Sequence, residues 1–143
     1  MRLLTLLTLA IALIAQSPAI TETQWRLKKV GDQAVVPGKG QKKPYLKLEA
    51  KDHRVVGFSG CNRLSGGYKL EGNELSFGPI TATKMACAEG MDTMNIEKLF
   101  TQALPRVKSY KIAGQSLTLL DSTGKVLAQL EAVAAKTPAA KTK

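Results

Sequence analysis

The two cysteines of this chain, Cys61 and Cys87, stand 26 positions apart. In an oxidising compartment two such thiols can form one disulfide, and closing a loop of this size would stabilise the fold by roughly 3 kcal/mol in the chain-entropy model. They can also remain buried thiols that pack as small apolar side chains. A metal site is not expected, because two cysteines and the single histidine, His53, do not supply four ligands at a recognisable spacing.

Polar side chains that could contact a partner directly follow the first cysteine. Asn62, Arg63 and Ser65 lie in the segment GCNRLSGG, residues 60–67. Asparagine, serine and glycine favour tight turns with their own hydrogen bonds, so the segment can be a compact structural turn. The alternative is a recognition loop in which these three side chains face a partner while Cys61 holds the base of the loop.

Three motifs that could indicate catalysis or nucleotide binding fail in detail. The segment 57–61 resembles a serine-hydrolase elbow, but Cys61 stands where that motif needs glycine. Lys39 is followed by Gly40, whereas a phosphate-binding loop needs serine or threonine there. His53 stands in a charged turn and is expected to be an ordinary solvated side chain. We therefore predict no catalytic residue, no cofactor and no enzymatic activity.

The N-terminal segment predicts export. A basic start, Met1-Arg2, precedes an apolar run over residues 3–15 and then polar Gln16-Ser17, which is the pattern of a secretory signal peptide. The apolar run is too short to span a bilayer as a helix. Cleavage is expected after Ala19, so residues 1–19 are predicted to be removed.

The formal net charge of +10 is dispersed along the chain. A basic surface can attract an anionic membrane by long-range electrostatics, or it can serve solubility alone. The chain has seven aromatic residues (one Trp, three Tyr and three Phe), and no basic stripe is interleaved with them in the sequence. Nucleic acid is therefore not an expected partner.

The elements that must position these residues are short strands and one helix. Residues 23–30 and 45–50 alternate as strands do, with Trp25 expected in the core, and residues 80–85 predict another strand. Two similar hairpins are predicted over 68–77 and 110–119, with glycine turns, followed by a strand over 125–132. Between the hairpins, Asp92 to Leu104 predicts an amphipathic helix that Pro105 ends.

This pattern predicts an α+β fold in which a strongly curved antiparallel sheet, an open half-barrel, wraps around the one helix. The predicted domain covers residues 20–133. The remaining residues, 134–143, are rich in lysine, alanine, threonine and proline, and we expect them to form a disordered tail.

The segments Gly60 to Tyr68 and Thr83 to Cys87, with the opening Trp25-x-Leu27, resemble the META domain of HslJ-type heat-inducible envelope proteins. The resemblance implies the same half-barrel around a helix. It also implies a role in envelope stress response and antibiotic tolerance, novobiocin in particular, without an assigned chemical activity. The family includes lipoproteins, but no cysteine stands at the predicted cleavage site, so a soluble periplasmic protein is expected.

These observations together predict a non-enzymatic exported binding or stress-protection module, acting as a monomer on an envelope protein or a lipid-like ligand not identified by the sequence. The alternative is a carrier that holds an apolar or lipid-like ligand between the sheet and the helix.

Overall fold

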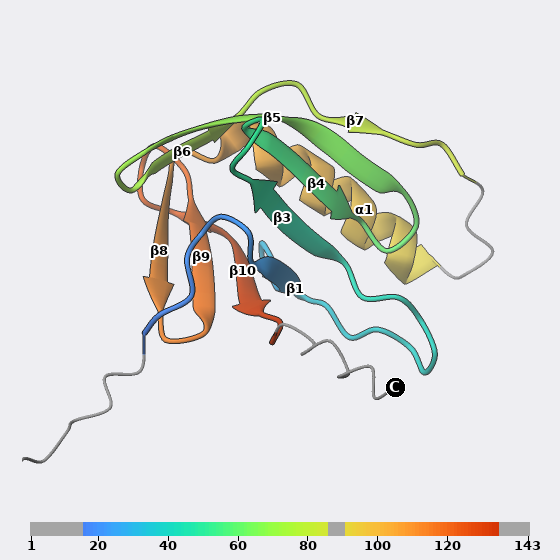
Figure 1. Cartoon of the computed structure of the whole chain (residues 1–143). Helices are drawn as coiled ribbons and strands as arrows, with labels where there is room; N and C mark the ends of the chain where they lie inside the picture. The colour runs from blue at the N-terminus through green and yellow to red at the C-terminus, as the bar shows by residue number, and fades with distance from the viewer. Residues whose placement is uncertain (1–15, 86–90, 135–143) are drawn as a thin grey trace, which may run out of the picture.

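The computed structural model describes residues 16–85 and 91–134 of the chain (Figure 1). These residues form short strands and one α-helix in the following order: β1 (Gln24–Val30), β2 (Gln33–Ala34), β3 (Tyr45–Glu49), β4 (Arg54–Phe58), β5 (Arg63–Glu71), β6 (Glu74–Phe77), β7 (Thr81–Ala82), α1 (Met91–Ala103), the 3₁₀ turn η1 (Leu104–Arg106), β8 (Ser109–Ala113), β9 (Ser116–Leu120) and β10 (Val126–Ala132).

The strands form one antiparallel sheet that curves into a ring. Its order is β10-β9-β8-β6-β5-β4-β3-β1-β2, and β1 also pairs with β10, which brings the first and last long strands together. The ring is weakest between β6 and β8, where the only register pair is Glu74↔Ser109. The sheet is therefore a ring of strands that is not a closed barrel, and the predicted α+β class with a strongly curved sheet and one helix is confirmed.

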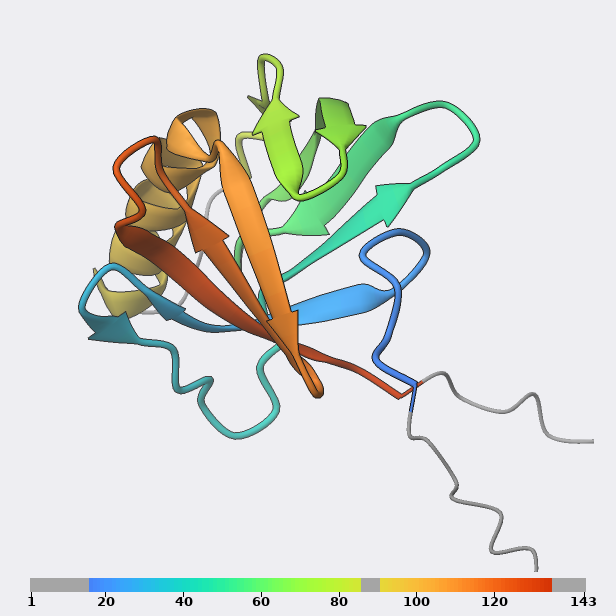
Figure 2. The ribbon, with the colours of Figure 1, turned by 90° about the vertical axis from the view of Figure 1, so that its left-hand side faces the viewer.

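The helix α1 packs its apolar stripe against β1 and β10, on one side of the ring (Figure 2). Ile96, Phe100 and Ala103 are buried, as their spacing of three or four positions predicts. The α-helix ends at Ala103, where Pro105 cannot continue the hydrogen-bond ladder, and a 3₁₀ turn follows. The helix predicted over Asp92 to Leu104 is thus confirmed within one residue at each end.

Trp25 lies at the centre of the core, as predicted, with no exposed surface. Its indole N–H donates to the Ile20 carbonyl oxygen at 3.0 Å, which fixes the chain just before β1. Ile20 is itself buried.

Two segments differ from the sequence-based prediction. Residues 63–67, predicted as a turn or a loop, form the first half of β5 and pair with β4, because Leu64 alternates inward between outward-facing Arg63 and Ser65. The strand predicted over residues 80–85 is only two residues long, Thr81–Ala82, and pairs with β5 alone.

Candidate functional site

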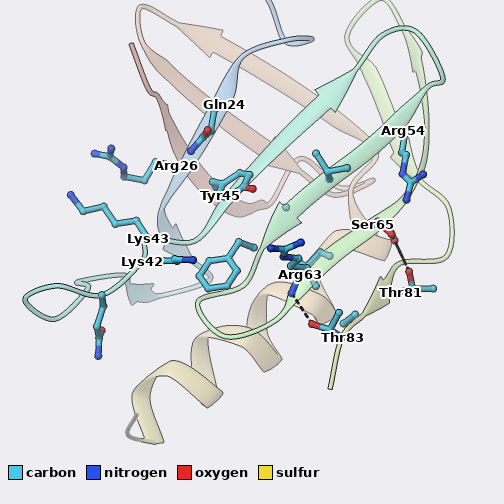
Figure 3. Close-up of a pocket in the computed structure, with 16 residues that line it drawn as sticks. Gln24, Arg26, Lys42, Lys43, Tyr45, Arg54, Arg63, Ser65, Thr81 and Thr83 are labelled. Carbon is cyan, nitrogen blue, oxygen red and sulfur yellow. Dashed lines mark hydrogen bonds between the residues drawn. The ribbon is translucent and has the colours of Figure 1, made fainter. Parts of the chain in front are cut away.

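A groove of about 1040 Å³ lies on the face of the sheet that is turned away from the core (Figure 3). Strand alternation creates this face: in β1, Trp25 is buried while its neighbours Gln24 and Arg26 line the groove. The same alternation in β3, β4 and β5 turns Leu46, Val55 and Leu64 toward the core and their neighbours outward. The groove lining includes Gln24, Arg26, Gln41, Lys42, Lys43, Tyr45, Arg54, Val56, Phe58, Arg63, Ser65, Thr81 and Thr83.

The register of the sheet brings four of these residues into one row across neighbouring strands. Arg26 in β1 is paired with Tyr45 in β3, Tyr45 with Phe58 in β4, and Phe58 with Arg63 in β5. Residues that are directly paired in this way have their side chains on the same face of a sheet. The row therefore places two partly exposed aromatic rings between two arginines.

Five basic side chains line the groove, two of them within this row, and no aspartate or glutamate lines it. The five are Arg26, Lys42, Lys43, Arg54 and Arg63. Among the described residues, none of them forms an ion pair with a carboxylate; the ion pairs that do form join Lys28 to Glu131, Lys47 to Glu22 and Arg106 to Asp121. The groove therefore has a local excess of positive charge that the described part of the chain does not neutralise.

The basic side chains gather at two ends of the groove. In Figure 3, Arg26, Lys42 and Lys43 lie on one side of Tyr45, while Arg54 and Arg63 lie on the other. Near Arg63 lie the hydroxyl groups of Ser65 and Thr81, which are 3.2 Å apart, and Thr83, which accepts the Arg63 backbone N–H at 3.0 Å. The groove thus combines separated cations with an aromatic centre and uncharged hydrogen-bonding groups.

The structure places the three residues of the predicted recognition loop in different roles. Arg63 and Ser65 line the groove from strand β5. Asn62 is buried, with 6% of its surface exposed, and its amide is used inside the fold. A single recognition loop presenting all three side chains is therefore not what the structure shows, because alternation turns Asn62 inward and Arg63 outward.

The Asn62 side chain joins three segments that are distant in sequence. Its Nδ2 donates to the Glu97 carboxylate of α1 at 2.7 Å. Its Oδ1 accepts the Met85 backbone N–H at 2.7 Å and the Thr83 hydroxyl at 3.1 Å. Asn62 therefore holds the helix and the segment after β7 against the start of β5, so it positions the groove wall that carries Arg63 and Thr83.

Cys61 lies just before β5, and its Sγ is 3.6 Å from the Met85 carbonyl oxygen. Cys87, its predicted disulfide partner, lies outside the described residues. The proximity of Cys61 to a residue two positions before Cys87 agrees with the predicted pairing, which stays a prediction.

His53 is exposed in the turn between β3 and β4, with a positive φ of 47° and its ring 5.7 Å from that of Tyr68. Within residues 16–85 and 91–134, no three His, Cys, Asp or Glu side chains gather so that they could hold a metal ion. No helix among those residues is long and apolar enough to cross a membrane.

Most of the groove was not predicted from the sequence. The sequence shows no basic stripe interleaved with aromatic residues, yet the register assembles such a surface from Arg26, Tyr45, Phe58 and Arg63, which lie on four different strands. The signal that could have indicated it is the outward position of each residue within its own alternating strand. That signal does not indicate which strands lie next to each other in the sheet.

The comparisons with known proteins agree with this architecture. The family model of the META domain matches residues 18–134. An NMR structure of a protein from Burkholderia xenovorans is similar with a TM-score of 0.64 and 27% identity, covering 80% of this chain and 84% of that one. A second NMR structure has a TM-score of 0.60 at 21% identity, covering 78% of this chain and 90% of the other, and supports the fold alone. No curated protein matches the chain. Because the family model covers most of its length, the chain belongs to the META domain family.

Proposed function

We propose that this protein is a non-enzymatic binding module that takes an anionic ligand in the basic groove. The observation that carries the proposal is the set of five basic side chains that line one groove without a carboxylate among the lining residues and without ion pairs in the described structure. Cations held close together repel one another, and an anionic ligand relieves that repulsion.

The composition of the groove favours a specific anion-binding site over a basic surface that serves solubility alone. Three of the five cations are the arginines Arg26, Arg54 and Arg63. The planar guanidinium group offers paired donors that match carboxylate and phosphate oxygens, and it is more weakly hydrated than an ammonium group. Arg26 is also only partly exposed, so a ligand that it binds is shielded in part from solvent.

The cellular setting of this proposal follows from the N-terminal sequence and the family resemblance. We propose that the chain is exported to the periplasm, with residues 1–19 removed, and that ligand binding there protects the envelope under stress. Heat shock and exposure to antibiotics such as novobiocin are the stresses that the HslJ-like resemblance suggests. A bacterial envelope offers many anionic molecules to a basic groove.

The outer groove supports this function better than the space between the sheet and the helix supports the carrier alternative. That inner space is occupied by side chains of the protein itself. Trp25, Phe100 and Leu104 are each at most 1% exposed there. An apolar ligand would have to displace such core contacts, whereas the outer groove is open to solvent.

Two variants with the same change in net charge test the proposal. The groove variant carries Arg26→Gln, Arg54→Gln and Arg63→Gln, and the matched control carries Lys108→Gln, Lys111→Gln and Lys125→Gln at exposed positions outside the groove. Binding of a polyphosphate chain is measured by calorimetry at several salt concentrations. We expect the groove variant to lose roughly tenfold or more in affinity and the control to remain close to the unmodified protein. Equal losses in both variants, or no binding of polyphosphate or of any other polyanion by the unmodified protein, would overturn the proposal.

A further inference from the structure

We propose that the ligand of the groove is an acidic oligosaccharide, whose sugar rings stack on Tyr45 and Phe58 while its anionic groups meet the arginines at the two ends. This inference rests on the proposed function of the groove as an anion site. It adds that the ligand contains rings as well as charges, and that it lies across the strands.

The row formed by Arg26, Tyr45, Phe58 and Arg63 crosses four strands. Neighbouring strands lie about 4.8 Å apart, so the backbone positions of this row span about 14 Å from Arg26 to Arg63. In Figure 3 the side chains of Arg26 and Arg63 lie on opposite sides of Tyr45. An occupant that contacts both arginines in these positions is extended, carries more than one anionic group and passes over the aromatic rings.

The occupant must also fit the aromatic centre of the row. Tyr45 and Phe58 are directly paired and both are partly exposed on the groove side of the sheet. Aromatic faces carry partial negative charge, so they attract the weakly positive C–H groups of a ring and repel a bare chain of phosphates. An oligosaccharide offers such C–H groups on the faces of its rings, whereas polyphosphate offers none.

Uncharged hydrogen-bonding groups surround the rings. Gln24 contributes a carboxamide, and Gln41 contributes its amide N–H groups, since its Oε1 accepts the Gly38 N–H at 2.8 Å. Ser65, Thr81 and Thr83 contribute hydroxyl oxygens. The Thr81 hydroxyl donates to the Ser65 carbonyl and the Thr83 hydroxyl to Asn62, so these two oxygens can still accept a hydrogen bond from a sugar hydroxyl but have no proton left to donate. The groove therefore has partners for the three features of an acidic sugar chain, namely ring faces, hydroxyl groups and anionic substituents.

A single-stranded nucleic acid would also use cations and aromatic rings. The acidic oligosaccharide is favoured because the N-terminal sequence predicts export, and acidic glycans rather than nucleic acids are the ring-containing polyanions of a cell envelope. The experiment includes the nucleic acid as an outcome that would contradict the inference.

The experiment compares four probes: oligogalacturonate, a neutral maltooligosaccharide of equal length, polyphosphate and single-stranded oligothymidylate. They are measured on the unmodified protein, on Tyr45→Val/Phe58→Val, and on Arg26→Gln/Arg63→Gln. Valine keeps the strand preference at positions 45 and 58 while removing the rings. Thermal unfolding of each variant, together with retained polyphosphate binding, shows that the aromatic variant is folded.

We expect oligogalacturonate to bind and the maltooligosaccharide not to bind. The aromatic variant should lose roughly tenfold or more in affinity for oligogalacturonate and keep its affinity for polyphosphate, while the arginine variant should lose affinity for both. As a second measurement, the ring protons of Tyr45 and Phe58 should shift in NMR spectra on addition of oligogalacturonate and not on addition of polyphosphate.

The failures of the two proposals can be distinguished. If the protein binds no polyanion at all, the proposed anion-binding function fails and this inference falls with it. If polyphosphate binds through the arginines but oligogalacturonate does not bind, or binds without any effect of the aromatic variant, the anion site stands and the oligosaccharide inference is wrong. Tighter, ring-dependent binding of oligothymidylate would assign the groove to a nucleic acid strand instead.

Discussion

Asn62 and Arg63 are adjacent in the sequence, but their side chains lie on opposite sides of the sheet. Asn62 is buried and hydrogen-bonded to Glu97, Thr83 and Met85, whereas Arg63 is exposed and lines the groove. The sequence grouped them because both are polar and both follow Cys61. Their side chains lie on opposite sides because strand alternation begins at Arg63. The glycines in this segment made it look like a turn, so the alternation was not recognised from the sequence.

The first prediction concerns the buried Asn62 amide. Asn62→Ala leaves the Glu97 carboxylate without its amide donor and the Met85 N–H without its acceptor. Both hydrogen bonds are only partly buried, so water can replace part of each lost contact, and we expect the free energy of unfolding to fall by about 1–2 kcal/mol. Urea denaturation measures it. The control is Arg63→Ala, which removes an exposed side chain and is expected to change stability by less than about 0.5 kcal/mol.

If Asn62→Ala keeps full stability but loses ligand affinity, Asn62 contacts the ligand directly, as the sequence-based prediction had it. A loss of stability with ligand affinity retained at low temperature would show that Asn62 stabilises the fold and that the groove does not depend on it for binding. A loss of both stability and affinity would agree with its role in positioning the groove wall.

The second prediction concerns pH and the Asp121 carboxylate in the turn between β9 and β10. The hydroxyl of Thr123 donates to Asp121 at 2.7 Å, and the backbone N–H groups of Lys125 and Thr123 also donate, while Arg106 lies 3.5 Å away. The Thr123 hydroxyl first, and then these other contacts, hold the pKa of Asp121 below its ordinary value of 3.8, against partial desolvation that raises it.

Because the pKa is lowered in the folded state, ionised Asp121 stabilises the fold above pH 3.8, and this stabilisation is lost as the pH falls toward the lowered value. We therefore expect Asp121→Asn to be less stable than the unmodified protein near neutral pH and to approach its stability in acid. Thermal unfolding across an acid series measures the difference. A stability difference that stays constant through the acid range would show that the hydrogen bonds do not depend on the charge.

At the scale of elements, strand β5 organises the groove because three neighbours converge on it. Its first half pairs with β4 on one edge and β7 on the other, and its second half pairs with β6. Gly66 lies against the segment that connects β6 to β7. A Cβ atom there would stand 2.7 Å from the Pro79 carbonyl oxygen and 2.8 Å from Ile80 Cδ1.

The third prediction compares two adjacent glycines of this strand. Gly66→Ala forces the 79–80 segment away from β5, and we expect it to lower the free energy of unfolding by about 2 kcal/mol. Gly67→Ala meets nothing closer than the His53 carbonyl oxygen at 3.9 Å, so it is expected to be nearly neutral. Chemical denaturation of both variants measures the contrast. Equal effects would mean that general strand preference, rather than close approach, explains why glycine is present.

The helix and most of the strands could be predicted from the sequence, whereas the pairing of each strand with its neighbours in the sheet could not. The helix followed from apolar residues spaced three and four apart, and the hairpins followed from glycine turns between alternating runs, both of which are local signals. The groove depends on Arg26 being paired with Tyr45 across a long connection, and on Phe58 being paired with Arg63. Such pairings are set by the packing of the whole sheet, so they cannot be predicted from a local sequence pattern.

The fourth prediction concerns the predicted disulfide between Cys61, which lies just before β5, and Cys87. If they form the predicted disulfide, Cys61→Ser should lower the melting temperature under oxidising conditions by an amount that corresponds to roughly 3 kcal/mol. In the presence of a reductant the variant and the unmodified protein should then unfold at similar temperatures. Titration of two free thiols in the native, oxidised protein would contradict the pairing.

At the scale of the whole molecule, two strand pairings that complete the ring differ greatly in length. On one side β1 and β10 pair over five register positions, from Trp25↔Ala132 to Val30↔Ala128. On the other side β6 and β8 share the pair Glu74↔Ser109 and two flanking hydrogen bonds, from Leu75 N–H to the Lys108 carbonyl and from Tyr110 N–H to the Asn73 carbonyl. The groove is lined by residues of β1, β3, β4, β5 and β7, of the loop before β3 and of the segment after β7, and by none of β6 or β8, so the weaker connection does not interrupt the binding surface.

The fifth prediction follows from this inequality. Local opening needs less free energy where fewer hydrogen bonds and contacts must separate, so the amides of Leu75 and Tyr110 should exchange with solvent faster than those shared between β1 and β10. Hydrogen exchange followed by NMR measures both sets in one sample. Addition of a groove ligand should further protect amides in β1, β3, β4 and β5 while leaving Leu75 and Tyr110 unchanged, because binding stabilises only the strands that contact the ligand. If all these amides exchanged at one common rate, the ring would open only by global unfolding, and the β6–β8 connection would be as strong as the rest of the sheet.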